Sequence, residues 1–306
     1  MLSHRLAIVT AGATFALILV GGLVTNTGSA LAVPDWPTTF GYNMFLYPWS
    51  QMVGGILYEH SHRLLGSLVG LLTVALATVL LFTERRGWVR ALGAAAVALV
   101  VAQGVLGGLR VVLVKDTLAI VHGALAQAFF ALTVVIAVVT SRRWREPQPV
   151  ADTGRLRGLA IGAVALLYLQ IVFGALLTHA GRVDLHLAGA AAVFVFVPMV
   201  TARARPAGRR AITRPALALL VLLFVQLGLG AGAYLARFST IALPGGQATA
   251  LALPVAPRLV AALILGAAAT LVAWLVRAGP VAVPTAGADP VRREAPYQPR
   301  TVEGTP

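Results

Sequence analysis

The chain has 306 residues, of which 58% are hydrophobic and 11% are charged, whereas about a quarter of the residues in a typical soluble domain are charged. This composition excludes an ordinary soluble globular domain, and the absence of cysteine excludes disulfides and thiolate metal ligands. The formal net charge of +14 leaves nucleic-acid binding open until the positions of the basic residues are considered.

Apolar runs of about 20 residues, each long enough to cross a bilayer as a helix, recur along the whole chain. Because a bilayer offers the backbone no hydrogen-bonding partners, such runs form helices whose peptide groups bond within the segment. The sequence therefore predicts an all-α polytopic membrane protein with eight transmembrane helices. The predicted spans are roughly Leu6–Thr25, Glu59–Phe82, Val89–Val112, Leu118–Thr140, Leu159–Thr178, His186–Thr201, Pro215–Tyr234 and Pro257–Val276.

The first predicted span has a competing interpretation as a signal peptide. His4 and Arg5 precede it, and Ala30-Leu31-Ala32 follows it like a small-residue cleavage site. Its apolar core of about 19 residues is longer than the roughly 7–15 residues of a signal peptide. We therefore favour a retained first helix.

Most of the basic residues fall on one side of this eight-helix arrangement. Of the 24 lysines and arginines, 18 lie on that side and six on the other. Because cytoplasmic segments are enriched in basic residues, we expect a bacterial plasma-membrane protein with both termini in the cytoplasm. The charge thus indicates topology, and nucleic-acid binding is not expected. The 18 residues are Arg5, Arg85, Arg86, Arg90, Arg142, Arg143, Arg145, Arg155, Arg157, Arg203, Arg205, Arg209, Arg210, Arg214, Arg277, Arg292, Arg293 and Arg300.

One sequence pattern recurs in each pair of predicted helices. Three odd-numbered spans end with a glutamine followed four residues later by a glycine, and the first span has Leu17 before Gly21. Three even-numbered spans begin with a histidine, and the last begins with an arginine. The glutamine–glycine pairs are Gln103 and Gly107, Gln170 and Gly174, and Gln226 and Gly230, and the even-span residues are His62, His122, His186 and Arg258.

This repeat predicts two pseudo-repeated four-helix bundles. We expect an N-terminal bundle at residues 1–141, a cytoplasmic linker at 142–158, a C-terminal bundle at 159–278 and a disordered cytoplasmic tail at 279–306. The tail contains many Pro, Arg and Glu residues, which is typical of disorder. Internal repeats are also common in transporters, so the repeat alone does not decide the function.

The histidines at the helix ends are the strongest functional signal, because ionisable residues inside a membrane usually serve a function. His62, His122 and His186 occupy equivalent repeat positions, and facing imidazoles could form an axial pair for a haem iron. The neighbouring glycines either allow close helix packing or leave a gap for a planar macrocycle. Zinc is disfavoured, because neither bundle supplies three or four clustered ligands.

The segment Tyr58–Gly70 holds further candidate residues. Glu59 and His62 are three residues apart and share a helix face, whereas His60 points elsewhere. Glu59 could orient a ligand, move protons, or be a helix N-terminal charge favoured by the dipole. Arg63 could hold a haem propionate or extend to the membrane interface.

These residues resemble the haem A synthase family of cytochrome oxidase assembly proteins. Glu59-His60-Ser61-His62-Arg63 is similar to the family's E-x-x-H-R motif, and Thr27–Pro37 is similar to its T-G-S-x-x-x-C-P-D-W-P loop. The stretch Gln103–Gly107 before His122 also fits, and the resemblance covers about residues 5–278.

The resemblance implies oxidation of a ring methyl of haem O to a formyl group, which gives haem A. It implies that the N-terminal bundle holds the substrate haem O at His62 and His122, with Glu59 as the catalytic acid/base or as the stabiliser of a cation. It further implies a haem b cofactor near His186, between the sixth and eighth helices. Haem O synthase and an electron donor are the implied partners, and a homo-oligomer stays open.

Two positions depart from the family pattern. Val33 replaces the loop cysteine, so the loop must be held in another way. Arg258 stands where the family has a histidine in the eighth helix, and arginine is a poor iron ligand because it stays protonated. Arg258 could bind a propionate instead, and a C-terminal haem b would then be bound by His186 alone, use His179, or be absent.

Three functions remain open at this point. The favoured one is a haem A synthase-type oxidoreductase. A non-catalytic haem-binding assembly or transfer protein is made plausible by Arg258. A small-molecule permease built on the repeat is least favoured, because the polar residues cluster at helix ends rather than near mid-membrane.

Overall fold

The computed structural model describes residues 2–146, 153–238 and 244–278, and its long helices number eight. All eight are long and apolar enough to cross a membrane, and the described residues form no β-strand, so the all-α prediction is confirmed. The helices are α1 (Leu2–Asn26), α2 (Gly55–Thr83), α3 (Gly87–Leu113), α4 (Asp116–Val139), α5 (Thr153–Ala180), α6 (Val183–Ala204), α7 (Arg210–Phe238) and α8 (Gly246–Arg277). Short 3₁₀ turns lie at Met44–Leu46, Trp49–Gln51, Arg143–Arg145 and Arg205–Ala207.

The helices extend beyond the predicted spans at most ends. The largest difference is in α8, which begins at Gly246 rather than near Pro257 and contains Pro254 and Pro257. Proline lacks an amide hydrogen, but membrane helices tolerate it because neighbouring groups satisfy the freed carbonyls. Helix α6 begins at Val183, and Asp184 in its first turn is favoured by the helix dipole.

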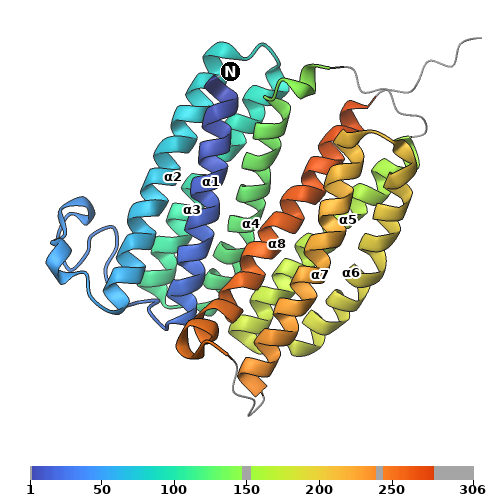
Figure 1. Cartoon of the computed structure of the whole chain (residues 1–306). Coiled ribbons are helices and arrows are strands. Elements are labelled where there is room, and N and C mark those ends of the chain that lie inside the picture. Colours follow the sequence, from blue (N-terminus) through green and yellow to red (C-terminus); the bar gives the residue numbers. More distant parts are fainter. Residues whose placement is uncertain (1, 147–152, 239–243, 279–306) are drawn as a thin grey trace, which may run out of the picture.

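The first four helices lie together on one side of the molecule and the last four on the other (Figure 1). Helix α1 contacts α2 and α4, and α3 also contacts α2 and α4. In the second group α8 contacts α5 and α7, and α6 contacts α5 and α7. Helices α4 and α8 meet where the groups join, and α1 also contacts α8. The pseudo-repeat and the assignment of two domains stay predictions.

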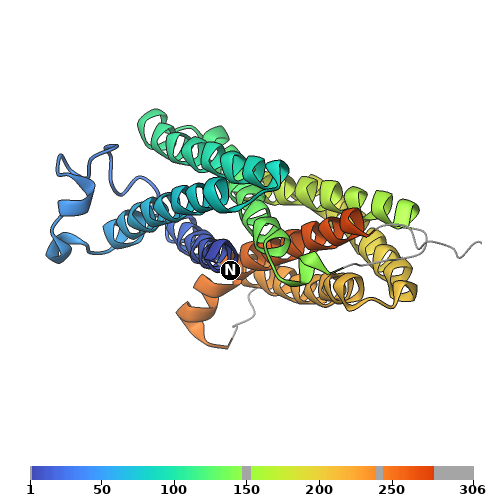
Figure 2. The same ribbon diagram turned by 90° about the horizontal axis from the view of Figure 1, so that it is seen from above.

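The two ends of the helix array differ in chemistry. We call the end where α1 starts the arginine-rich end, because Arg5, Arg86 and the turn Arg143–Arg145 lie there. We call the opposite end, where α2, α4 and α6 start, the histidine end. Residues 27–54, which join α1 to α2, extend sideways from the histidine end (Figures 1 and 2).

Buried threonines inside the helices are satisfied without disturbing the packing. Thr10 donates to the carbonyl of Leu6 over 2.8 Å, and Thr73 donates to the carbonyl of Val69 over 2.7 Å. Each hydroxyl therefore bonds one turn back along its own helix, which is how small polar side chains are accommodated in an apolar interior.

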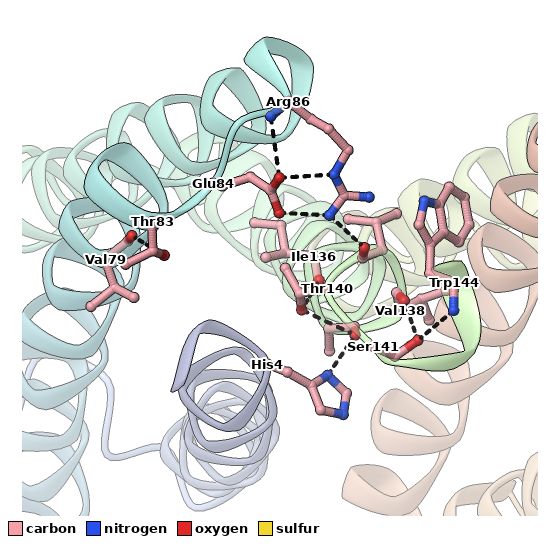
Figure 3. Close-up of polar contacts among 12 residues, drawn as sticks. His4, Val79, Thr83, Glu84, Arg86, Ile136, Val138, Thr140, Ser141 and Trp144 are labelled. Carbon is pink, nitrogen blue, oxygen red and sulfur yellow. Dashed lines mark hydrogen bonds and ion pairs between the residues drawn. The ribbon is translucent and has the colours of Figure 1, made fainter. Parts of the chain in front are cut away.

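An ion pair between Glu84 and Arg86 fixes the α2–α3 connection at the arginine-rich end (Figure 3). Arg86 binds both carboxylate oxygens of Glu84 and also donates to the carbonyl of Val139 at the end of α4 over 3.0 Å. The guanidinium lowers the pKa of the Glu84 carboxyl to about 2, because hydrogen bonding to Arg86 outweighs the effect of burial.

We expect Glu84→Gln to lower the free energy of unfolding by about 1 kcal/mol at neutral pH, because it replaces a charge-assisted pair with a neutral contact. The pKa of Glu84 is lowered from 4.5 to about 2, so its stabilisation is complete above about pH 4.5 and is lost as the pH falls toward 2. Thermal unfolding of the detergent-purified protein against pH measures this difference. Glu146→Gln, at an exposed carboxylate, is the matched control and should change little. An equal effect of both changes would contradict a specific role for the Glu84–Arg86 pair.

Candidate functional site

His62 of α2 and His122 of α4 face one another at the histidine end. Their ring centroids are 6.4 Å apart and the ring planes meet at 76°. Metal–imidazole bonds are about 2 Å long, so two imidazoles on opposite sides of one ion have centroids roughly 6 Å apart. The separation of these two rings is therefore close to that of an axial pair. The sequence predicted that these residues belong together, and the structure brings them together.

Each of these histidine rings lies against a glycine of the preceding helix. A Cβ atom on Gly21 would lie 3.0 Å from His62 Cε1, and one on Gly107 would lie 3.4 Å from His122 Cε1. In the second group of helices, a Cβ on Gly174 would lie 3.7 Å from His186 Cε1. The repeated glycines therefore let an imidazole lie against the neighbouring helix. This role was not among the two considered from the sequence, which were close helix packing and a gap for a planar macrocycle.

Two of the repeated glutamines hold the backbone of the histidines. Gln103 Nε2 donates to the carbonyl of His122 over 3.1 Å, and Gln170 Nε2 donates to that of His186 over 3.0 Å. Gln170 Nε2 also lies 3.3 Å from His186 Nδ1. These bonds fix the register of α4 against α3 and of α6 against α5. The sequence revealed the repeat of glutamine and histidine but did not indicate this bond.

The Nδ1 atoms of the facing histidines lie beside the glycines of the preceding helices, 3.4 Å from a Cβ on Gly21 and 3.8 Å from one on Gly107. Nδ1 of His62 and Nδ1 of His122 are both buried and without a partner within the described residues. Arg110, in the last turn of α3, lies within electrostatic range of both rings. Arg110 was not predicted as a site residue, although its position three residues after the repeated Gly107 is a signal that could have indicated it.

Glu59 connects α2 to the loop before it. Its Oε2 accepts a hydrogen bond of 2.9 Å from the backbone amide of Val33, and its Oε1 accepts one of 2.9 Å from Arg63 Nη2. The side chains of Glu59 and Arg63 are only 7% and 9% exposed, so these two residues, one helical turn apart, form a buried ion pair. The carboxylate contacts the loop, whereas His62 three residues later contacts Gly21.

Arg63 binds three backbone carbonyls of the same loop. Its Nη2 donates to Val33 over 2.9 Å, and its Nη1 donates to Asp35 over 2.7 Å and to Thr38 over 3.0 Å. The sequence did not predict these bonds, and contact of Arg63 with a propionate stays a prediction. The loop carbonyls accept from both terminal nitrogens, and Nη2 also donates to Glu59, so Arg63 is a loop anchor.

The loop has further internal supports. Burial raises the pKa of Asp35, but hydrogen bonds from the amides of Gly41 and Phe40 and from the Thr38 hydroxyl outweigh it and lower that pKa to about 2. The indole of Trp36 lies directly on Gly108 of α3, where any Cβ would collide with it. These contacts attach the loop to both α2 and α3.

His60 lies beneath the loop and away from the facing histidines. Its Nδ1 is 3.1 Å from the Thr39 hydroxyl, and its ring centroid is 5.1 Å from that of Tyr47. The side chain is buried, and its neighbours are loop residues. His60 is therefore part of the loop support.

Arg258 of α8 turns toward the first group of helices. Its Nη1 donates to the carbonyl of Gly22 in α1 over 3.2 Å, and its own carbonyl accepts from Gln127 of α4 over 3.4 Å. The contact is close because Gly22 has no side chain. Arg258 therefore joins α8 to α1 and does not form a pair with His186. Propionate binding by Arg258 stays a prediction.

His186 has no histidine opposite it on α8, because the sequence of α8 contains none. His179 lies in the last turn of α5 and is half-buried. Among residues 2–146, 153–238 and 244–278, no group of three His, Asp or Glu side chains could hold a metal ion. The geometry at the histidine end therefore supports a two-ligand site in the first group of helices, formed by His62 and His122.

The first part of the chain is similar in sequence to known proteins. A family model described as cytochrome oxidase assembly protein matches residues 4–185. The heme A synthase of Shouchella clausii (strain KSM-K16) is 29% identical over 184 residues, which are 57% of this chain and 58% of that protein. The heme A synthase of Exiguobacterium sibiricum (strain DSM 17290) is 29% identical over 191 residues, which are 59% of this chain and 61% of that protein.

The chain thus aligns with about three-fifths of the length of these curated relatives. The region matched by the family model includes Glu59, His62 and His122 and ends immediately before His186. Because that match covers more than half of the chain and contains the facing histidines and the anchored loop, the protein belongs to the cytochrome oxidase assembly protein family.

Proposed function

We propose that the protein is a membrane oxidoreductase of the haem A synthase type, which converts a ring methyl of haem O to a formyl group. The observation that carries this proposal is the facing pair of His62 and His122 within the region matched by the family model. Two heme A synthases among its relatives support the choice of reaction. Haem O is the substrate, and the product would serve cytochrome oxidase biogenesis.

The residues of the first group of helices fit an iron porphyrin. His62 and His122, whose ring centroids are 6.4 Å apart, would hold the iron, and the Nδ1 atom of each ring is buried without a hydrogen-bond partner among the described residues. Gly21 and Gly107 allow the rings to lie close to α1 and α3, and Gln103 fixes the backbone of His122. Bound haem O would supply the iron and the methyl group, and these side chains would hold and orient it. Arg110 provides a cation for its carboxylate groups.

We assign to Glu59 the role of holding or moving a proton at Oε2, where it now binds the amide of Val33. Arg63 positions that carboxylate through Oε1 and simultaneously holds the loop. The carboxylate of Glu59 would therefore both hold or move a proton and attach the loop to α2. Electrons for the reaction would be exchanged with a partner protein.

The residues of the second group of helices do not fit a haem b held by two histidines. His186 lies against Gly174 and Gln170, while Arg258 is turned to Gly22 of α1. Arginine is also a poor iron ligand because it stays protonated. We derive no catalytic step through a haem b, and any haem in this half would depend on His186 without a partner from α8.

A second candidate function follows because the second group of helices does not fit a haem b held by two histidines. Without a cofactor haem in the C-terminal half, the protein would bind haem in assembly or transfer without oxidising it. The observation that favours this candidate is the contact of Arg258 with Gly22. A permease is the weakest alternative, because the ion pairs of the described residues lie at the two ends of the helix array and not near its middle.

We further propose a plasma-membrane location with both termini in the cytoplasm, so that the histidine end faces outward. Haem O synthase would supply the substrate, an electron-transfer partner would exchange electrons, and a homo-oligomer is compatible with the fold. Fusion of a reporter enzyme to each terminus and to the loop at residues 27–54 tests the orientation.

We expect His62→Ala and His122→Ala each to lower the bound haem about tenfold or more and to change its spectrum, because each removes an iron ligand. The measurement is extraction and mass identification of the porphyrins in the purified protein, beside the reduced-minus-oxidised spectrum. His60→Ala, on the same helix but beneath the loop, is the matched control and should retain the haem. Equal losses in all three variants would contradict the assignment of the facing pair.

We expect Glu59→Gln to retain haem but to reduce the conversion of haem O to haem A by about 100-fold, within the usual contribution of general acid–base catalysis. A glutamine oxygen can still accept from Val33, while its NH2 group cannot accept from Arg63 Nη2, so Arg63 keeps only its three carbonyl contacts with the loop. Conversion is followed by mass identification of haem A in cells that make haem O. Wild-type conversion would remove the proton function of Glu59 and leave only its attachment to the loop.

We expect Arg258→His to leave the haem spectrum unchanged, because position 258 contacts α1 and not His186. Arg258→Ala should lower the thermal stability of the purified protein, because the carbonyl of Gly22 loses its partner. The spectrum of the oxidised protein and its unfolding temperature are the measurements. A new low-spin signal in Arg258→His would show that position 258 can reach the iron.

A further inference from the structure

A cavity at the arginine-rich end is not used by the proposed reaction. It has a volume of about 380 Å³ and lies between the start of α1 and the end of α4. Its lining includes His4 and four arginines, Arg5, Arg142, Arg143 and Arg145. The hydroxyl residues Thr140 and Ser141 complete the lining, so it contains no carboxylate. The nearest acidic residue in sequence, Glu146, is exposed and does not line the cavity.

A mainly apolar groove continues from this cavity along the helices. It has a volume of about 280 Å³ and shares His4, Ser141 and Arg143 with the basic cavity. Its other walls are apolar surfaces of three helices, with Ile8 and Ala11 from α1, Val134, Ala137 and Val138 from α4, and Trp274 from α8. Positive charge at the helix ends thus adjoins an apolar channel that runs toward the membrane interior.

Three of these arginines, Arg142, Arg143 and Arg145, lie at a turn after α4 that is firmly attached. Trp144, between Arg143 and Arg145, is buried, with its ring centroid 5.2 Å from that of Trp274 and 6.1 Å from that of Trp88. Its carbonyl accepts from Arg277 Nε over 3.2 Å, and its amide donates to the Ser141 hydroxyl over 3.3 Å. His4 Nδ1 lies 2.8 Å from the carbonyl of Ala137 (Figure 3). The walls are therefore preorganised, which lowers the entropic cost of binding a ligand.

We propose that this cavity and groove bind one anionic phospholipid, with the phosphate among the arginines and an acyl chain along α1, α4 and α8. Guanidinium groups bind phosphate oxygens through charge-assisted bonds. Basic pockets between membrane helices are typical sites for anionic head groups. A free phosphate ion would use only the basic cavity, whereas a lipid also accounts for the continuous groove. This site is independent of the histidine end and goes beyond the proposed function.

The test is native mass spectrometry of the purified full-length protein with dioleoyl phosphatidylglycerol and dioleoyl phosphatidylcholine as probes. We expect tighter binding of the anionic lipid, and we expect Arg143→Ala with Arg145→Ala to weaken it about 10- to 30-fold, from the usual contribution of each basic residue near a lipid surface. The matched control is Arg203→Ala with Arg205→Ala, two exposed arginines at the α6–α7 connection. The control should bind the lipid as the wild type does.

Two further arms separate a lipid from a free anion. Ala11→Phe, which fills the groove, should weaken the dioleoyl lipid but not the short-chain dihexanoyl phosphatidylglycerol, while inorganic phosphate at millimolar concentration should not displace the lipid. Equal binding of the two dioleoyl lipids, an equal effect of the control arginines, or displacement by phosphate would overturn the proposal. Haem content and spectrum should stay unchanged in Arg143→Ala with Arg145→Ala, so this result is separable from that for the reaction.

Discussion

The buried ion pair between Glu59 and Arg63 is the interaction on which the histidine end depends. Two charges taken out of water are stable only when their remaining hydrogen-bonding groups find partners. Here the partners are the amide of Val33 and the carbonyls of Val33, Asp35 and Thr38. The pair and the loop therefore need one another, since the loop backbone satisfies the charges and the charges hold the loop on α2. Removal of either side chain would leave an uncompensated charge in a buried place.

The facing histidines are positioned by a small set of contacts that recurs along the chain. A glycine on one helix accepts the imidazole of the next, and a glutamine one turn earlier binds the backbone of that histidine where glutamine is present. In the first group of helices this places His62 and His122 at the separation of two ligands on one ion. In the second group His186 is held in the same way, but the arginine on α8 is drawn to the carbonyl of Gly22.

The sequence predicts the eight helices because each needs only an apolar run of sufficient length, and it predicts the His62–His122 pair because both residues occupy a repeated position. It did not predict the contacts of Arg63, since the three carbonyls that it binds belong to an irregular loop with no periodic pattern. It also gave Arg258 the repeat position of the histidines, but it did not predict the bond of Arg258 to the carbonyl of Gly22. The close approach of α8 to α1 at Gly22 depends on how the two groups of helices meet, which periodicity within one helix does not reveal.

The attachment of Val33 through its peptide group has a consequence for the chemistry that this loop can withstand. The family's loop motif has a cysteine at this position, and any disulfide formed by a cysteine there would open by thiol exchange in reducing surroundings. Val33 is fully buried, and its amide and carbonyl are held by Glu59 and Arg63. No electron transfer can open that connection. The order of this loop therefore does not depend on the redox state of its surroundings, and the protein needs no oxidative folding step to form it.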